Sequence, residues 1–164
     1  MKSIRLAVIF DQVVKSGGGY QQALNSALLT KELPKDSVEV IFFTLFKENV
    51  QTLAAHGIQA KVINFSLFEK FRNKLRGKIK NKYFFKLIKK CEKYSPFEKK
   101  LIKSNIDLVY FLSPISLHES LEELNYITTL WDLCHLDELE FPEIRKDKEF
   151  ERREMSYKNI LSRS

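Results

Sequence analysis

Short apolar stretches alternate with segments in which apolar residues recur at the three- and four-residue spacing of a helix. This alternation limits the possible fold more than any other feature of the chain. Apart from Arg5, the stretch "IRLAVIF" (Ile4–Phe10) is apolar and it contains several β-branched residues, which is typical of a central parallel strand buried on both faces. Four later stretches predict further strands: Val38–Thr44, Ala60–Phe65, Ile106–Ser113 and Tyr126–Asp132. The pattern therefore predicts an α/β domain with a parallel sheet and right-handed crossovers.

In the segments between these strands, apolar residues recur at helical spacing. In Gly19–Leu33, Ala23, Leu24, Ala27 and Leu28 recur at helical spacing, and Pro34 follows the segment. Other helices are expected at Glu48–Gly57, Phe97–Ser104, His118–Leu124 and Lys146–Leu161. The chain contains no internal repeat and no low-complexity linker, so residues 1–164 are interpreted as one domain.

The composition is that of an ordinary globular protein, with 44% hydrophobic and 30% charged residues. No apolar run reaches the roughly 18 residues that span a bilayer. The start "MKSIRLAVIF" is similar to a signal peptide, but a glycine-rich turn follows it instead of a small-residue cleavage site, so a buried strand is favoured. Two cysteines and three histidines favour neither a disulfide framework nor a metal site. A cytoplasmic protein without a bound cofactor is expected.

The net charge of +7 is concentrated in one segment. Leu67–Lys103 contains 14 Lys and Arg residues against three Asp and Glu, whereas the rest of the chain has a net charge of −4. Apolar residues between Phe68 and Cys91 recur at three- and four-residue steps, which indicates a basic amphipathic helical insert.

Several functions are compatible with this basic segment. Its lysines could contact an anionic membrane surface, and the residues predicted for this role are Lys78, Lys80, Lys82, Lys86, Lys89 and Lys90. The segment could also bind a pyrophosphate-bearing acceptor, or it could be a helix with a lysine-rich outer face that packs on the core. Nucleic acid is disfavoured as a partner because no recognition motif accompanies the charge.

Ligands of parallel α/β sheets bind in the crevice beyond the carboxyl ends of the strands. The loops expected there are Asp11–Gly19, Phe46–Glu48, Ser113–His118 and Asp132–Pro142. In the first loop, Gly17, Gly18 and Gly19 precede a helix, where bare amides favour phosphate binding. A tight turn that uses glycine only for its backbone conformation is the alternative. Neither the dinucleotide-binding fingerprint nor a Walker A loop is present.

The last of these loops has the densest group of chemically active side chains. Asp132 and His135 are three residues apart and could act together in proton transfer or in binding a substrate hydroxyl. Alternatively, Asp132 caps a helical turn and His135 packs beside Trp131. No second histidine lies nearby, which disfavours a metal. His118 follows the fourth strand and is predicted to contact an acceptor.

The glycine loop, the segment "YITTLWDLCHLDELEFPEIR" and the charged helix "KDKEFERREMSYKNIL" together resemble glycosyltransferase family 4. The resemblance implies a Rossmann-like N-terminal half of a GT-B fold, which holds a glycan or lipid-linked acceptor. It also implies a retaining transfer from a nucleotide sugar during cell-surface polysaccharide biosynthesis at the inner face of a membrane. The three glycines match the loop that approaches the donor diphosphate, and Asp132 matches an Asp of the family segment.

Two departures from the family pattern qualify these expectations. Relatives often have His immediately before that Asp, and this chain has Trp131 there. The donor-side E-x7-E motif is not present in the 164 residues, so a C-terminal donor domain is expected as a partner. Such a half is expected to transfer sugar poorly alone, because both walls of the cleft must position the reactants. The alternative is a non-catalytic α/β module that recruits a membrane or partner through its basic helices.

Overall fold

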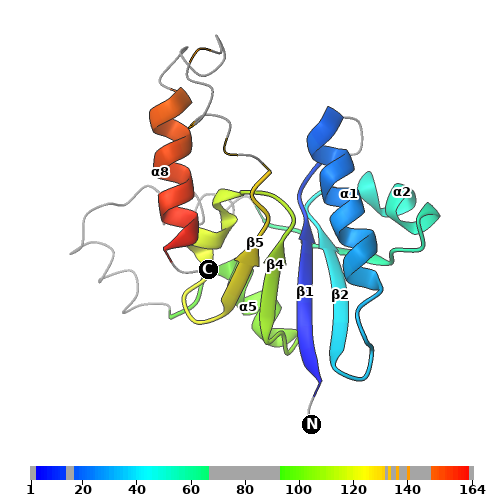
Figure 1. The fold of residues 1–164 in the computed structure, drawn as a ribbon. Helices are drawn as coiled ribbons and strands as arrows, with labels where there is room; N and C mark the ends of the chain where they lie inside the picture. Colours follow the sequence, from blue (N-terminus) through cyan, green and yellow to red (C-terminus); the bar gives the residue numbers. More distant parts are fainter. Residues whose placement is uncertain are drawn as a thin grey trace.

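The computed structural model describes residues 3–13, 17–66, 93–131, 133, 136, 140 and 149–162. These residues contain a five-stranded, all-parallel sheet in the order β3-β2-β1-β4-β5. The strands are β1 (Ile4–Phe10), β2 (Val38–Thr44), β3 (Ala60–Val62), β4 (Leu108–Phe111) and β5 (Asn125–Thr128). The helices are α1 (Gly17–Lys31), α2 (Asn49–Ala55), α5 (Pro96–Lys103), the 3-10 helix η1 (Ser116–Ser120) and α8 (Glu149–Leu161) (Figure 1). The α/β prediction is confirmed as a Rossmann-like parallel sheet with flanking helices.

Strand β1 lies at the centre of the sheet and is buried on both faces. Leu6, Val8 and Phe10 pack on one face with apolar residues of α1 and α2. Ala7 and Ile9 point to the opposite face, where they pack with residues of α5 and α8. Successive side chains of a strand point to opposite faces, so a strand covered on both sides must be continuously apolar. This requirement explains the unbroken apolar run Leu6–Phe10.

Helix α1 packs on the sheet through the small apolar face that the sequence predicts. Ala23, Leu24 and Ala27 are buried, whereas Leu28 is only half-buried. The helix begins at Gly17, two residues before the predicted start. Gly18 therefore belongs to the first helical turn, whereas Gly17 starts the helix with a left-handed φ of +53°.

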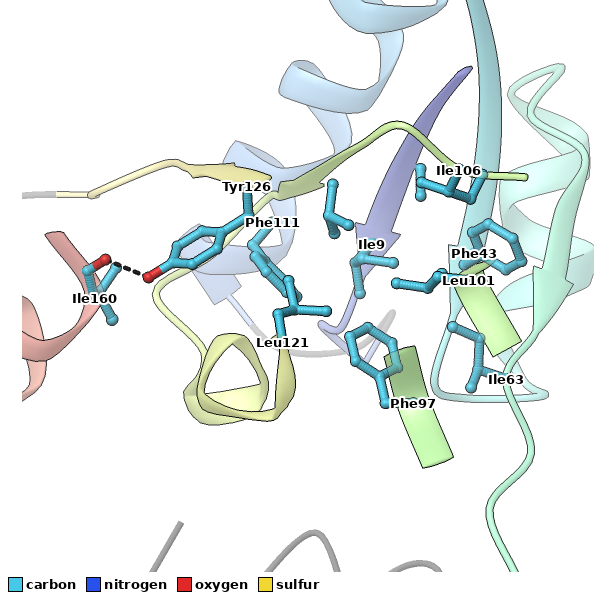
Figure 2. Close-up of a cluster of buried hydrophobic side chains, with 12 residues drawn as sticks. Ile9, Phe43, Ile63, Phe97, Leu101, Ile106, Phe111, Leu121, Tyr126 and Ile160 are labelled. Carbon is cyan, nitrogen blue, oxygen red and sulfur yellow. Dashed lines mark hydrogen bonds between the residues drawn. The ribbon is translucent and has the colours of Figure 1, made fainter. Parts of the chain in front are cut away.

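A second apolar layer joins α5 and α8 to the other face of the sheet (Figure 2). Phe97 and Leu101 of α5 are fully buried against the strands. Tyr126 of β5 packs edge-on to Phe111 of β4, with ring centroids 5.7 Å apart. The Tyr126 hydroxyl also donates a hydrogen bond of 2.5 Å to the carbonyl oxygen of Ile160, which attaches the end of α8 to the sheet.

Glu98 of α5 is fully buried and organises the chain between η1 and β5. Its Oε1 accepts hydrogen bonds of 2.7–2.9 Å from the backbone N–H groups of Glu122, Glu123 and Leu124. Three amide donors compensate much of the cost of burying a carboxylate. The predicted helix over His118–Leu124 is wrong: the structure has η1 at Ser116–Ser120, because Glu98 binds the amides that a helix would have used.

Strands β3 and β5 end earlier than predicted, because each ladder ends where the neighbouring strand ends. Strand β4 is also shorter than predicted, although β1 extends beyond both ends of its ladder with β4. Val62 of β3 pairs with Thr44, the last residue of β2. Thr128 of β5 pairs with Phe111, the last residue of β4. The apolar residues beyond these pairs have no strand beside them to continue the ladder.

No helix in the described part of the chain is long and apolar enough to cross a membrane. The predicted basic insert falls mostly outside the described residues, which resume at Lys93. Its last residues form α5, which begins with Ser95 as N-cap: the Ser95 side chain accepts a 3.0 Å hydrogen bond from the amide of Glu98. This end of the basic segment is therefore a core-packing helix.

Candidate ligand site at the carboxyl edge of the sheet

The order in which the chain adds strands to the sheet changes sides at β1. Strand β2 lies on one side of β1 and β4 lies on the other, so the connections leave the two carboxyl ends in opposite directions. Such a switch point opens a crevice that commonly binds ligands in α/β proteins. The first polar side chains past these two strands are Asp11, after β1, and Ser113, after β4.

Asp11 and Ser113 form a hydrogen-bonded pair at this switch point. The Ser113 hydroxyl donates to Oδ1 of Asp11 over 2.5 Å, and Ser113 is only 2% exposed. Burial raises the pKa of the Asp11 carboxyl, and hydrogen bonds, foremost the one from Ser113, offset part of that effect. A partly buried carboxyl of raised pKa is suited to accept or exchange a proton with a bound hydroxyl.

Asn49 fixes the chain that follows Asp11. Its Nδ2 donates to the carbonyl oxygen of Gln12 over 2.6 Å and to Oγ1 of Thr44 over 3.1 Å. Asn49 and Thr44 are fully buried. The start of α2 and the end of β2 thereby hold the segment after β1 at a defined place beside the crevice.

The three glycines at the start of α1 have different surroundings. Gly17 has a φ of +53°, which glycine adopts without strain. Apart from their chain neighbours and the helix backbone, no atom of the described residues lies within 4 Å of the Cβ positions of Gly17 and Gly18, and both glycines are exposed. A Cβ at Gly19 would lie 2.7 Å from Cη2 of Trp131, closer than real atoms pack. Close packing with the indole is therefore sufficient to explain the third glycine, and phosphate contact at all three stays a prediction.

Trp131 lies between α1 and α8. Its Nε1 donates a hydrogen bond of 3.3 Å to the carbonyl oxygen of Leu112, which orients the ring. On the side of α8 the indole lines a cavity of about 280 Å³. The other lining residues are Pro114, Glu149, Arg152, Arg153, Ser156 and Tyr157.

The charged residues of this cavity are bonded to each other along α8. Arg152 donates to Glu149 through Nε and Nη2, over 2.6 and 2.7 Å, and Nε of Arg153 donates to Oε1 over 2.9 Å. The hydrogen bonds from Arg153 and Arg152 lower the pKa of Glu149. The cavity wall therefore holds two guanidinium groups against one carboxylate.

His118 lies in η1, where it is only 5% exposed. Its Nδ1 lies 2.7 Å from the carbonyl oxygen of Ile115, and its ring centroid lies 5.5 Å from that of Tyr126. Nε2 is buried without a hydrogen-bond partner among the described residues. These contacts belong to the second apolar layer, and the role of His118 in acceptor binding stays a prediction.

All the other predicted site residues lie outside the described residues: Asp132, His135, Lys78, Lys80, Lys82, Lys86, Lys89 and Lys90. Conversely, the structure adds Asp11 and Ser113, which sequence reasoning placed in crevice loops without assigning them a role. Their position as the first polar residues after two apolar strands could have identified them. Within the described residues, no cluster of three or more His, Cys, Asp or Glu side chains could hold a metal ion.

The comparisons with known proteins do not show a family for this chain. No family model matches it, and no curated protein matches it. Among solved structures, formyltetrahydrofolate deformylase from Burkholderia mallei is similar at 8% identity and a TM-score of 0.37. That match covers 68% of this chain but only 30% of the deformylase chain.

Proposed function

We propose that this domain is the acceptor-side half of a retaining glycosyltransferase resembling family 4. The observation that carries the proposal is the Asp11–Ser113 pair at the switch point, beside the first turn of α1. A partly buried carboxyl bonded to a serine hydroxyl suits the hydroxyl groups of a saccharide, and the bare amides of a helix start suit a diphosphate.

In this proposal the two ends of the crevice have separate roles. Gly17, Gly18 and Gly19 approach the donor diphosphate, whose negative charge grows as the sugar leaves. Asp132 or His135 orients the acceptor hydroxyl, and Asp11 positions the acceptor through a further hydrogen bond. The nucleotide sugar itself is held mainly by a C-terminal partner domain.

Nucleotide titration tests the phosphate contact directly. UDP and GDP are added to the labelled protein, and amide chemical shifts are followed at Gly17, Gly18 and Ser113. Shifts at these amides are expected, and Gly18→Val should abolish them, since valine fills the open space beside Gly18. Gln22→Val, one turn later on the exposed face of α1, is the matched control and should leave them unchanged. If millimolar nucleotide shifts none of these amides, the proposal fails.

A second function, recruitment to a membrane without catalysis, is favoured by the concentration of positive charge in Leu67–Lys103. Each Lys or Arg near an anionic surface contributes about 1 kcal/mol to binding. Replacing Lys78, Lys80, Lys82 and Lys86 with Glu should release the protein from phosphatidylserine vesicles in a sedimentation assay. Unchanged sedimentation would remove the membrane from the proposal, and tight, salt-sensitive RNA binding would favour a nucleic-acid partner instead.

A further inference from the structure

The cavity beside α8 is lined by charged, hydroxyl-bearing and aromatic side chains. Glu149, Arg152, Arg153, Ser156 and Tyr157 recur at three- and four-residue intervals, so they lie on one face of α8. That face is opposed by Pro114, which follows β4, and by Trp131, which follows β5. The site is thus assembled from a helix and two loops at the carboxyl edge of the sheet.

We propose that this cavity binds a monosaccharide that carries one anionic group, a phosphate or a carboxylate. The anion is bound by Arg152, whose guanidinium group lines the cavity. Arg152 directs two of its N–H groups to Glu149, and a guanidinium has five. Its side chain is 74% exposed, so its other N–H groups are accessible to a ligand.

The remaining lining residues suit the sugar ring. The indole of Trp131 provides a flat apolar wall for the C–H face of a pyranose, and its hydrogen bond to Leu112 holds it in place. Ser156 and Tyr157 bring hydroxyl groups to the same face of α8. A volume of about 280 Å³ is slightly below the roughly 300–1,000 Å³ found for ligand pockets, so one sugar ring fits and a long glycan does not.

The location of the cavity connects it with the proposed function. Trp131 contacts Gly19 on one side and lines the cavity on the other, so a ligand there lies next to the crevice. If the domain is the acceptor-side half of a glycosyltransferase, the acceptor is an anionic sugar. This last statement rests on the proposed function, whereas the binding itself does not.

Trp131 is the chain's only tryptophan, so its fluorescence reports on the cavity directly. The protein is titrated separately with glucose 1-phosphate, glucuronic acid, glucose and inorganic phosphate. At least one of the two charged sugars is expected to change the emission at lower concentration than both glucose and phosphate. If neither charged sugar does so, the proposal is overturned. Which of the two binds more tightly distinguishes a phosphate from a carboxylate as the anion.

Removing a positive or a negative charge from α8 should change the affinity for the charged sugar in opposite directions. Arg152→Gln should weaken binding about 10-fold, because it removes the charged hydrogen-bond donor that binds the anion. Glu149→Gln should strengthen it, because it removes the carboxylate that competes for both guanidinium groups. Lys158→Gln is the control, since Lys158 pairs with Glu154 on the same helix and does not line the cavity. Weaker binding in Glu149→Gln with an unchanged unfolding midpoint would overturn the proposal.

These experiments separate the two proposals. If the protein binds a charged sugar but no nucleotide, only the glycosyltransferase function is refuted. Nucleotide binding without any response to the charged sugars would refute only the anionic-sugar site.

Discussion

Gly19 and Trp131 are in such close contact that no side chain fits between them. A Cβ at Gly19 would lie 2.7 Å from Cη2 and 3.0 Å from Cζ3 of the indole. The two residues are far apart in the sequence, and their contact brings the first turn of α1 against the chain that follows β5.

Gly19→Ala should therefore destabilise the domain. The added methyl group must displace the indole or shift α1, and overpacking of this kind costs about 1–3 kcal/mol. Urea unfolding followed by Trp131 fluorescence measures the loss and also reports any change in the environment of the ring. Gly18→Ala is the control, because its Cβ meets no atom within 4 Å. It should be neutral or slightly stabilising, and equal losses in both variants would contradict this explanation.

Asp11→Asn should make the protein more stable at neutral pH. The pKa of Asp11 is raised in the folded protein, so the folded chain holds this proton more tightly than the unfolded chain. The resulting stability is present below the unfolded pKa and is lost as the pH rises through the folded pKa. The Tm difference between Asp11→Asn and the wild type should be positive at pH 7 and should shrink toward pH 4. Exposed Asp36→Asn is the control. A Tm difference that grows toward low pH would contradict a raised pKa of Asp11 in the folded protein.

Glu98→Ala should be among the most destabilising substitutions in the described part of the chain. It removes the acceptor of three backbone N–H groups and leaves a cavity in the second apolar layer. Loss of hydrogen bonds to a charged group predicts a cost of about 3 kcal/mol or more in the free energy of unfolding. Chemical denaturation measures it, with Glu119→Ala on the exposed side of η1 as the control. Faster hydrogen exchange at Glu122, Glu123 and Leu124 should accompany the loss.

Tyr126→Phe should loosen α8 while leaving the sheet intact. The hydroxyl of Tyr126 donates to the carbonyl oxygen of Ile160, and loss of such a hydrogen bond costs about 1 kcal/mol. Amide exchange should increase in the last turn of α8 and remain unchanged in β1. Tyr94→Phe removes a hydroxyl that donates to Glu123 at the surface, and it should have no effect on α8. Unchanged exchange at Ile160 in Tyr126→Phe would refute this role.

The sequence was sufficient to predict the elements whose pattern is local. Strands β1 and β2 have the predicted bounds, because their apolar stretches are as long as their ladders. The ends of β3 and β5 depend on neighbouring strands, which local patterns do not describe. Likewise, the helix predicted over His118–Leu124 does not form because Glu98 binds the backbone there. This contact joins residues more than twenty positions apart.

The candidate site was predictable only at the level of loops. The α/β pattern correctly placed Asp11 and Ser113 in loops beyond strand ends, because parallel strands share a carboxyl edge. Their pairing across 102 positions depends on β1 and β4 being neighbours, which the alternation of elements does not reveal. The same is true of Trp131, whose contact with Gly19 gives the glycine a packing role.

The burial of β1 on both faces has a consequence for how the domain melts. Because five consecutive residues, Leu6–Phe10, supply side chains alternately to the two apolar layers, neither layer can detach while the other keeps its packing against this strand. The amide protons of β1 should consequently exchange only through complete unfolding, and heating should give a single cooperative transition.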